Sequence, residues 1–176
     1  SLRLVGSEMC IRDSYKIKNI SKDNFKNYGD LITTSNKNYE SINKDTTDSF
    51  FDLANIQIIG DDKRSRLNIF QAKKRKFPLK INMLENHPFS SQVFLPFNAT
   101  GFLVLVAPIG NKPKIDLIEI FKVSGGDGIN FNPKVWHFPL ISLENEKYIT
   151  IDKKDADNNI EIYNFEQSEI FELNYE

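Results

Sequence analysis

Short apolar runs separated by polar turn residues dominate the last two thirds of the chain. The runs are rich in Ile, Val, Phe and Leu, and turn-forming clusters such as Gly60 to Asp62 and Ser124 to Gly128 separate them. This pattern predicts β-strands rather than helices. The predicted strands are 54–59, 67–71, 79–84, 92–97, 102–107, 118–123, 128–131, 148–152 and 160–165.

Regularly spaced short strands predict a sandwich or a barrel, and the spacing alone leaves the two open. Ahead of them, residues 21–29 predict one short helix, because Ser21 can cap its first turn and Gly29 can adopt the left-handed conformation that ends a helix. Residues 33–48 are polar, and we expect a loop on the surface or at the mouth of a pocket. The predicted fold class is therefore all-β with a short N-terminal helix.

Composition narrows the partners of the molecule. The chain has 176 residues, and its 23 Lys and Arg residues nearly balance its 24 Asp and Glu residues. Such a balance gives no electrostatic case for binding nucleic acid or an anionic membrane surface, so we expect neither partner. No apolar run approaches the roughly 20 residues that a membrane span needs. We expect a small-molecule ligand instead.

The first fourteen residues, Ser1 to Ser14, differ in composition from the rest and resemble adapter-derived sequence more than a signal peptide. We expect residues 1–14 to stay outside the fold and residues 15–176 to form a single domain. Cys10 is the only cysteine of the chain and lies in this leader. Disulfides, thiolate nucleophiles and cysteine metal clusters are therefore excluded, and a cytoplasmic location fits.

Two histidines are the strongest candidates for chemistry. Histidine changes its protonation near neutral pH and is the commonest metal ligand in proteins. His137 follows Trp136, the only tryptophan, in a segment that Pro133 and Pro139 bend. This segment is either the wall of a pocket or a core strand with a hydrogen-bonded histidine at its end. If the fold brings both imidazoles into one pocket, that pocket is the active site.

Glu85 and His87 lie two residues apart, so an extended chain points both side chains to the same face. Such a pair can share a metal or place an acid beside a base. Pro88 makes a continuous strand through His87 unfavourable. The alternative interpretation is a polar turn that leads into the predicted strand 92–97.

Blocks of sequence along nearly the whole chain after residue 15 resemble the ureidoglycolate lyase family. They are Tyr28 to Ile32, Ile42-Asn43, Asp52-Leu53-Ala54, Leu84 to Pro96, Phe102 to Ala107, Gly128 to Leu140 and Ile151-Asp152. The resemblance implies a cupin-like β-barrel, of the double-stranded β-helix type, that usually forms a homodimer. It also implies an enzyme of purine and allantoin degradation that splits ureidoglycolate into glyoxylate and urea.

The resemblance also implies roles for individual residues, which cupin barrels take from two separated strand motifs. The implied catalytic residues are His87, His137 and Glu85. A weakly bound divalent metal would be held by His87, Gln92 and His137. The expected substrate-binding residues are Gln92, Asn130, Asn132, Lys134 and Trp136, with Lys134 as the contact to the substrate carboxylate; Asp152 also matches the family pattern.

Several cationic positions of the family pattern are altered here. Two family arginines are Gln71 and Asn86, and the family's Arg-Tyr-His is Ser49-Phe50-Phe51. Because arginine is the side chain best shaped to hold a carboxylate, two alternatives stay open. One is a divergent cupin enzyme for another small hydroxy-acid or carbonyl substrate. The other is a non-catalytic dimeric binding module, which apolar filling of the barrel by residues such as Phe51 and Phe138 would favour and a pocket of a few hundred Å³ would oppose.

Overall fold

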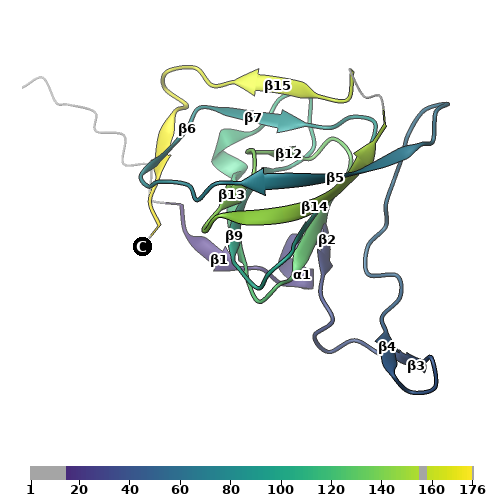
Figure 1. Ribbon diagram of the computed structural model, residues 1–176. Helices are drawn as coiled ribbons and strands as arrows, with labels where there is room; N and C mark the ends of the chain where they lie inside the picture. The colour runs from purple at the N-terminus through teal and green to yellow at the C-terminus, as the bar shows by residue number, and fades with distance from the viewer. Residues whose placement is uncertain (1–14, 155–157, 176) are drawn as a thin grey trace, which may run out of the picture.

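Two β-sheets face each other and form the body of the protein in a computed structural model, which describes residues 15–154 and 158–175 (Figure 1). The fold is all-β and cupin-like, as the sequence predicts. The leader at residues 1–14 lies outside the described residues. No helix in the described part of the chain is long and apolar enough to cross a membrane.

The first sheet contains seven strands, and all its pairings are antiparallel except that of its edge strand β1 with β10. In spatial order the strands are β1 (Ile17–Asn19), β10 (Glu119–Val123), β9 (Phe102–Ala107), β12 (Trp136–His137), β7 (Met83–Asn86) and β15 (Glu161–Asn164), with β13 (Ile141–Ser142) also paired to β9.

The second sheet contains five antiparallel strands. In spatial order they are β2 (Gly29–Ile32), β11 (Gly128–Phe131), β8 (Gln92–Pro96), β14 (Glu146–Lys153) and β5 (Ser65–Ala72). Two small pairs complete the fold: β16 (Phe171–Leu173) with β6 (Leu79–Ile81), and β3 (Glu40–Ile42) with β4 (Thr47–Ser49). The helical elements are α1 (Lys22–Phe25) and a 3-10 turn (Ile115–Leu117).

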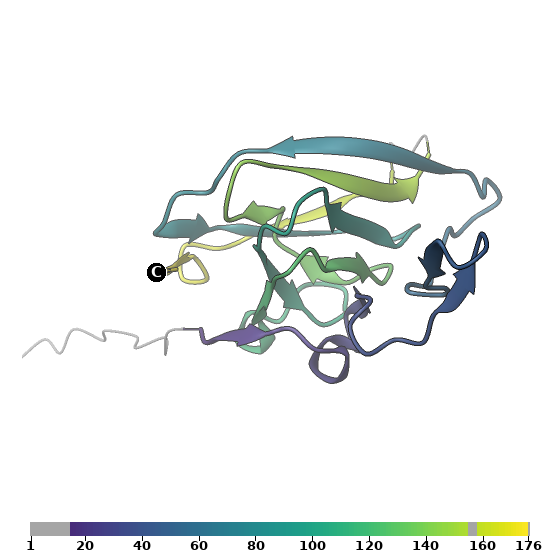
Figure 2. The ribbon, with the colours of Figure 1, turned by 60° about the horizontal axis from the view of Figure 1, so that its bottom comes forward.

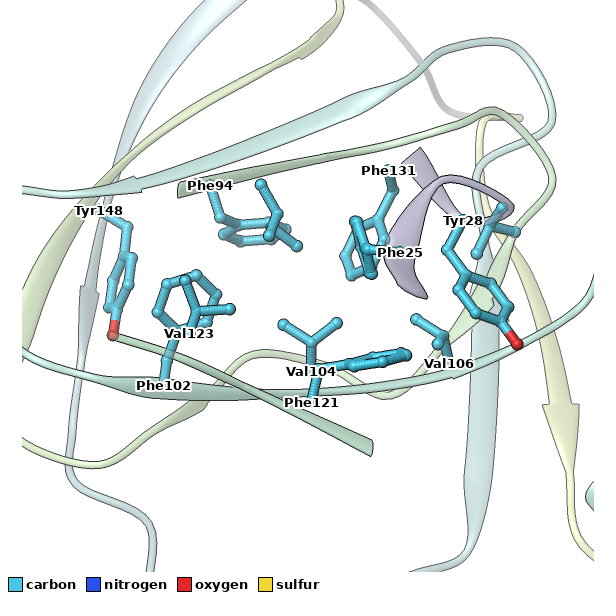
Figure 3. Close-up of a cluster of buried hydrophobic side chains, with 12 residues drawn as sticks. Phe25, Tyr28, Phe94, Phe102, Val104, Val106, Phe121, Val123, Phe131 and Tyr148 are labelled. Atoms are coloured by element: carbon cyan, nitrogen blue, oxygen red, sulfur yellow. The ribbon is translucent and has the colours of Figure 1, made fainter. Parts of the chain in front are cut away.

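Aromatic and β-branched side chains fill the space between the two sheets. Figure 3 shows Phe94, Phe131 and Tyr148 pointing toward Phe102, Val104 and Phe121 across this core. The other face of the first sheet is also covered, by a second apolar cluster that includes β6 and β16. Strand β9 is therefore buried on both faces, which explains why its sequence is an unbroken apolar run instead of an alternating one.

The predicted helix over residues 21–29 is shorter than expected, since α1 covers only Lys22–Phe25. Ser21 does cap it: the Ser21 hydroxyl accepts a hydrogen bond from the Asn24 amide, and the Asn24 side chain accepts one from the Ser21 amide. The role predicted for Gly29 is wrong, because Gly29 begins β2 instead of ending the helix. A Cβ atom at Gly29 would lie 1.9 Å from the Asn130 carbonyl oxygen of the paired strand.

One predicted strand is wrong. Residues 54–59 form only a single bridge, between Ile58 and Ser90. Two backbone hydrogen bonds join the segment to residues 89–91: the Ile59 amide donates to the Phe89 carbonyl oxygen, and the Ser91 amide donates to the Gln57 carbonyl oxygen. Side chains accept from two further amides of the segment, since the Asn55 amide donates to Asp30 and the Gln57 amide donates to the Ser91 hydroxyl.

The other predicted strands are present, and 79–84 divides into β6 and β7. The predicted loop at 33–48 contains β3 and the first residues of β4. The hairpin of these two strands stands away from both sheets in the two ribbon views (Figures 1 and 2).

Candidate functional site

His137 lies inside the barrel at the end of a very short strand. Strand β12 places it directly opposite Glu85 of β7 on one side and Val106 of β9 on the other. Only 2% of its surface is exposed. Pairing on both sides fixes the backbone of this two-residue strand, so the imidazole has a defined position although the local sequence does not favour a strand.

His87 follows β7 and brings its ring next to that of His137. The ring centroids are 5.3 Å apart, with an angle of 40° between the planes. On its other side, His137 stacks on Phe131 of β11 at 4.2 Å and 15°. Fifty residues of chain separate the two histidines, and the fold brings both into one place, which was the condition set by the sequence.

Both imidazoles are held in the same tautomer. Nδ1 of His87 lies 2.6 Å from the Asn159 carbonyl oxygen, and Nδ1 of His137 lies 2.9 Å from the Val135 carbonyl oxygen. A carbonyl oxygen can only accept, so each Nδ1 carries the proton and donates it. In the neutral form of either ring, Nε2 then keeps a bare lone pair, which is the form that binds a metal or accepts a proton.

The charge states around His137 follow from its burial. Burial, and then the proximity of His87, lower the pKa of His137 to about 3, although the hydrogen bond to Val135 acts in the opposite direction. His137 is therefore neutral at neutral pH. Its Nε2 lies 3.8 Å from Oε1 of Glu85, so this contact is not an ion pair at neutral pH. Burial also raises the pKa of Glu85, against the opposing effect of His87.

The donor atoms of this cluster suit a divalent metal. One donor atom each from Glu85, His87 and His137 lies within 4.8 Å of the other two. Nε2 of both histidines and Oε1 of Gln92 are buried and have no hydrogen-bond partner among the described residues. Buried acceptors without a partner are costly, and a shared cation or a bound substrate would satisfy them together. Imidazole, carboxamide and carboxylate ligands together fit a first-row divalent metal.

Gln92 lies beside the stacked rings. It is 5% exposed, and in the ladder between β8 and β11 it pairs with Phe131, on which His137 stacks. Gln92 is therefore on the strand next to the one that supports His137.

Two other predicted substrate contacts point away from the histidines. Asn130 lies next to Phe131 on β11 and so points to the opposite face, where its amide nitrogen donates to Asp30 and to the Asn55 carbonyl oxygen. Trp136 likewise alternates with His137, and its indole N–H donates to the Gly110 carbonyl oxygen within the second apolar cluster.

Asn132 and Lys134 belong to the turn between β11 and β12. The Asn132 amide donates to the Tyr28 carbonyl oxygen, and the Lys134 amide donates to the His87 carbonyl oxygen. The side chain of Lys134 is exposed. Their roles in substrate binding, and those of Asn130 and Trp136, stay predictions, and the geometry favours Gln92 over all four.

The sequence did not identify Asn159 as a residue of the site. Asn159 is 3% exposed and supplies the carbonyl oxygen that fixes the His87 tautomer. Its partners are 69 or more residues away in the chain, so no local pattern could reveal these contacts.

The middle of the barrel is filled with apolar side chains, and the histidine cluster lies at its end. A cavity of about 10 Å³ lies in this apolar middle, between residues that include Phe94, Phe131 and Phe138. This volume holds at most one water molecule. Phe138 thus helps to fill the interior, as the binding-module alternative requires, but Phe51 is 57% exposed and does not. A depression of about 780 Å³ lies elsewhere, around Lys73, Asn98 and Lys147, and does not include the histidines.

The chain is similar to known proteins along most of its length. The chain matches the family model described as Ureidoglycolate lyase over residues 12–172. A curated protein named ureidoglycolate lyase from Pseudomonas aeruginosa (strain LESB58) is 34% identical over 155 residues, which are 88% of this chain and 92% of that protein. One from Pseudomonas putida (strain GB-1) is 31% identical over 159 residues, 90% of this chain and 95% of that protein. One from Pseudomonas savastanoi pv. phaseolicola (strain 1448A / Race 6) is 34% identical over 158 residues, with 89% and 93% covered.

Proposed function

We propose that this chain, which belongs to the ureidoglycolate lyase family, cleaves ureidoglycolate into glyoxylate and urea at the paired histidines. The observation that carries the proposal is the pair of imidazoles, with ring centroids 5.3 Å apart, whose Nε2 atoms are buried with Glu85 and have no hydrogen-bond partner among the described residues. A cluster of this kind offers a proton acceptor and a site for a developing negative charge, which are the two requirements of the reaction.

Ureidoglycolate carries a hydroxyl group and a urea nitrogen on the same carbon. Glu85 accepts the hydroxyl proton, the O–H electrons form the carbonyl of glyoxylate, and the carbon–nitrogen bond breaks. Glu85 then returns the proton to the departing urea nitrogen. Burial raises the pKa of Glu85. Its carboxylate is therefore a stronger base than that of an exposed glutamate, and its pKa lies closer to neutral pH, which favours a group that must both accept and return a proton.

We further propose that His87, His137 and Gln92 hold a divalent metal through Nε2, Nε2 and Oε1, with Glu85 as a possible fourth ligand in the absence of substrate. When bound, such a metal lowers the pKa of the substrate hydroxyl and stabilises the oxygen charge. The hydrogen bonds from each Nδ1 to a backbone carbonyl keep the imidazoles oriented for this role. With two imidazoles and a carboxamide as its core ligands, the site is expected to bind metal weakly.

Purified protein with ureidoglycolate tests the proposal. We expect urea and glyoxylate to appear in equal amounts, activity to fall after treatment with a chelator, and activity to return with an added divalent metal. The control is His137→Ala, checked for folding by circular dichroism. Release no faster than in this control would exclude the proposed reaction. Full activity after complete metal removal would exclude the metal while leaving the reaction in place.

We propose a homodimer that works in allantoin breakdown, as the family resemblance implies, and a cytoplasmic location, which fits the lack of cysteine after residue 14. Strand β5 is the last strand of its sheet, and Leu67 and Ile69 on it are 65% and 57% exposed. They pair with Ile151 and Ile149, which extends an apolar surface over the outer face of the sheet. An antiparallel β5 pair around a two-fold axis would cover this surface and the open strand edge.

Light scattering after gel filtration tests the dimer. We expect a dimer for the wild-type protein and a monomer for Ile69→Lys, with Leu117→Lys, at another exposed apolar position, as the matched control. A wild-type monomer would contradict the proposed assembly.

A further inference from the structure

The imidazole of His137 lies between two other rings. Phe131 of β11 covers one of its faces, with ring centroids 4.2 Å apart and 15° between the planes. The ring of His87 lies on the other side, at 5.3 Å and 40°. Phe131 and His137 come from different sheets, since β11 belongs to the second sheet and β12 to the first. The stack therefore joins the two sheets at the histidine pair.

The hydrogen bond of His137 does not by itself fix the plane of its ring. The torsion about the Cβ–Cγ bond of histidine has broad minima, so its own preference leaves the ring able to tilt. Nδ1 donates to the Val135 carbonyl oxygen at 2.9 Å, and a hydrogen bond of this kind tolerates a deviation of about 30° from linearity. A tilt of the ring would turn Nε2 away from the cluster with Glu85. A contact with the face of the ring removes this freedom.

Phe131 can supply this contact because its own position is fixed. Its strand pairs with β2 on one side and with β8 on the other, and Phe131 is 5% exposed. Phe94 meets its ring edge-on at 6.1 Å and 76°, and Phe25 lies beside it at 6.2 Å and 49° (Figure 3). A tilt of the His137 imidazole would press one of its edges into a ring that close-packed neighbours hold in place.

The stack also sets the spacing between site residues of the two sheets. Phe131 pairs directly with Gln92 in the ladder between β11 and β8, and neighbouring strands lie about 4.8 Å apart. In the first sheet, His137 pairs directly with Glu85. The cluster therefore takes residues from both sheets, and the contact between Phe131 and His137 keeps Gln92 at a fixed distance from the imidazole.

His87 is held by other contacts. The Lys134 amide donates to the His87 carbonyl oxygen at 3.0 Å, which ties the turn before His137 to the segment that carries His87. The Asn159 carbonyl oxygen accepts from Nδ1 of the His87 ring. The orientation of His87 therefore has restraints of its own, whereas the plane of His137 depends on the stack.

We propose that Phe131 is a positioning residue of the active site, whose ring holds the plane of the His137 imidazole so that Nε2 points into the buried cluster. Phe131 acts through His137 and is itself not a ligand of the substrate or the metal. This inference rests on the proposed function for the identity of the reaction, but the orientation of the ring can be measured without any substrate.

NMR of the histidine ring nitrogens tests this role in the absence of substrate and metal. The chain has two histidines, so the spectrum of the untagged protein contains two imidazoles. For the wild type at neutral pH we expect His137 as one Nδ1-protonated neutral tautomer with sharp signals. Phe131→Met removes the aromatic face while it keeps most of the volume. In this variant we expect the His137 signals to broaden or to shift toward a mixture of the two tautomers.

Phe94→Met is the matched control. Phe94 is as buried as Phe131 and belongs to the same core cluster, but its ring meets Phe70 and Phe131 instead of an imidazole. We expect it to leave the His137 signals unchanged. Phe131→Leu is a second variant without an aromatic face, and thermal unfolding checks that the variants fold. An unchanged single tautomer in the Phe131 variants, or equal broadening in Phe94→Met, would overturn the role of Phe131.

The wild-type spectrum gives a test that needs no variant. The ring current of Phe131 should shift the carbon-bound ring protons of His137 upfield, because the two rings are stacked. Ordinary shifts for these protons would overturn the stack, and the positioning role with it.

Steady-state kinetics connect the role to the proposed reaction. We expect kcat for ureidoglycolate to fall about 10-fold or more in Phe131→Met and KM to change by less than about threefold, because a misplaced group loses rate more than binding. Phe94→Met should keep the wild-type kcat. Wild-type kcat in Phe131→Met despite disturbed His137 signals would overturn the positioning role. Disturbed signals in Phe131→Met, with no turnover by the wild type, would overturn the proposed reaction alone.

Discussion

Asn159 organises the surroundings of His87 through three contacts. Its main-chain oxygen accepts from Nδ1 of His87, its Oδ1 accepts from the Phe89 amide at 2.7 Å, and its Nδ2 donates to the Ser90 hydroxyl at 2.8 Å. One buried side chain therefore closes the turn that carries His87, and its backbone fixes the tautomer of the ring.

Replacing Asn159 with alanine should destabilise the protein by about 1–3 kcal/mol, because the Phe89 amide loses its acceptor and the buried Ser90 hydroxyl loses one of its two partners. Urea denaturation measures this change in the free energy of unfolding. Asn158→Ala is the matched control, since Asn158 is exposed, and it should stay within about 0.5 kcal/mol of the wild type. Equal stability of the two variants would show that the contacts of Asn159 do not contribute to the free energy of unfolding.

At the residue scale, the small number of histidines drew attention to the two residues that the fold brings together. Only two exist, and both segments are unusual in composition. The tautomer of His87 and the role of Asn159 depend on partners distant in the chain and were beyond any local pattern. The orientation of Trp136 was within reach, because neighbours on a strand point to opposite faces and His137 takes the inner one.

At the scale of elements, close approach of β2 to β11 requires glycine at position 29. Gly29→Ala should cost about 3 kcal/mol or more, since the new methyl group would overlap the Asn130 carbonyl oxygen. Gly125→Ala is the matched control: it also has a positive φ, of 72°, but no atom lies within 4 Å of the added Cβ. That variant should lose only about 1–2 kcal/mol. Thermal and urea unfolding of both proteins decide, and similar losses would contradict the account of β2.

Glu146 ties the start of β14 to the turn after β8. Burial acts to raise the pKa of Glu146, but hydrogen bonds outweigh it and leave the pKa below its usual value. They come from the Thr100 hydroxyl at 2.5 Å, the Lys147 amide at 2.7 Å and the Asn98 side chain at 3.0 Å.

A pKa that is lower in the folded state stabilises the protein at a pH above the unfolded value of about 4.3, and this stability is lost as pH falls through the folded value. We therefore expect Glu146→Gln to be less stable than the wild type at pH 7, with a difference that shrinks below about pH 4. Denaturation midpoints between pH 3 and pH 7 measure it, with Glu144→Gln, at an exposed position, as the control. A difference that does not depend on pH would contradict the assignment.

Strand prediction succeeded where burial shaped the sequence. Strand β9 is apolar throughout because both faces are covered, and β14 alternates because only one face is. The two residues of β12 carry no such signal, and their strand exists only because β7 and β9 lie on either side. The segment 54–59 shows the reverse case, since it has strand composition but forms a single bridge, and its Asn55 and Gln57 amides bind side chains.

At the scale of the whole molecule, the two sheets create a closed apolar core with a polar end. The sequence indicated strands and turns but left sandwich and barrel open, because the choice depends on which strands meet across the chain. It also placed the chemistry inside the barrel in general terms. In the structure the pair of histidines lies at one end, and Phe94, Phe131 and Phe138 occupy the middle.

The central claim is that His87 and His137 act as one unit. A double-mutant cycle of His87→Ala, His137→Ala and the combined variant, followed by urea release from ureidoglycolate, tests it most directly. We expect each single variant to lose about 100-fold or more in kcat, and the double variant to lose little beyond either one, because residues that act together are not additive. Wild-type turnover in either folded single variant, or losses that simply multiply in the double variant, would contradict the account.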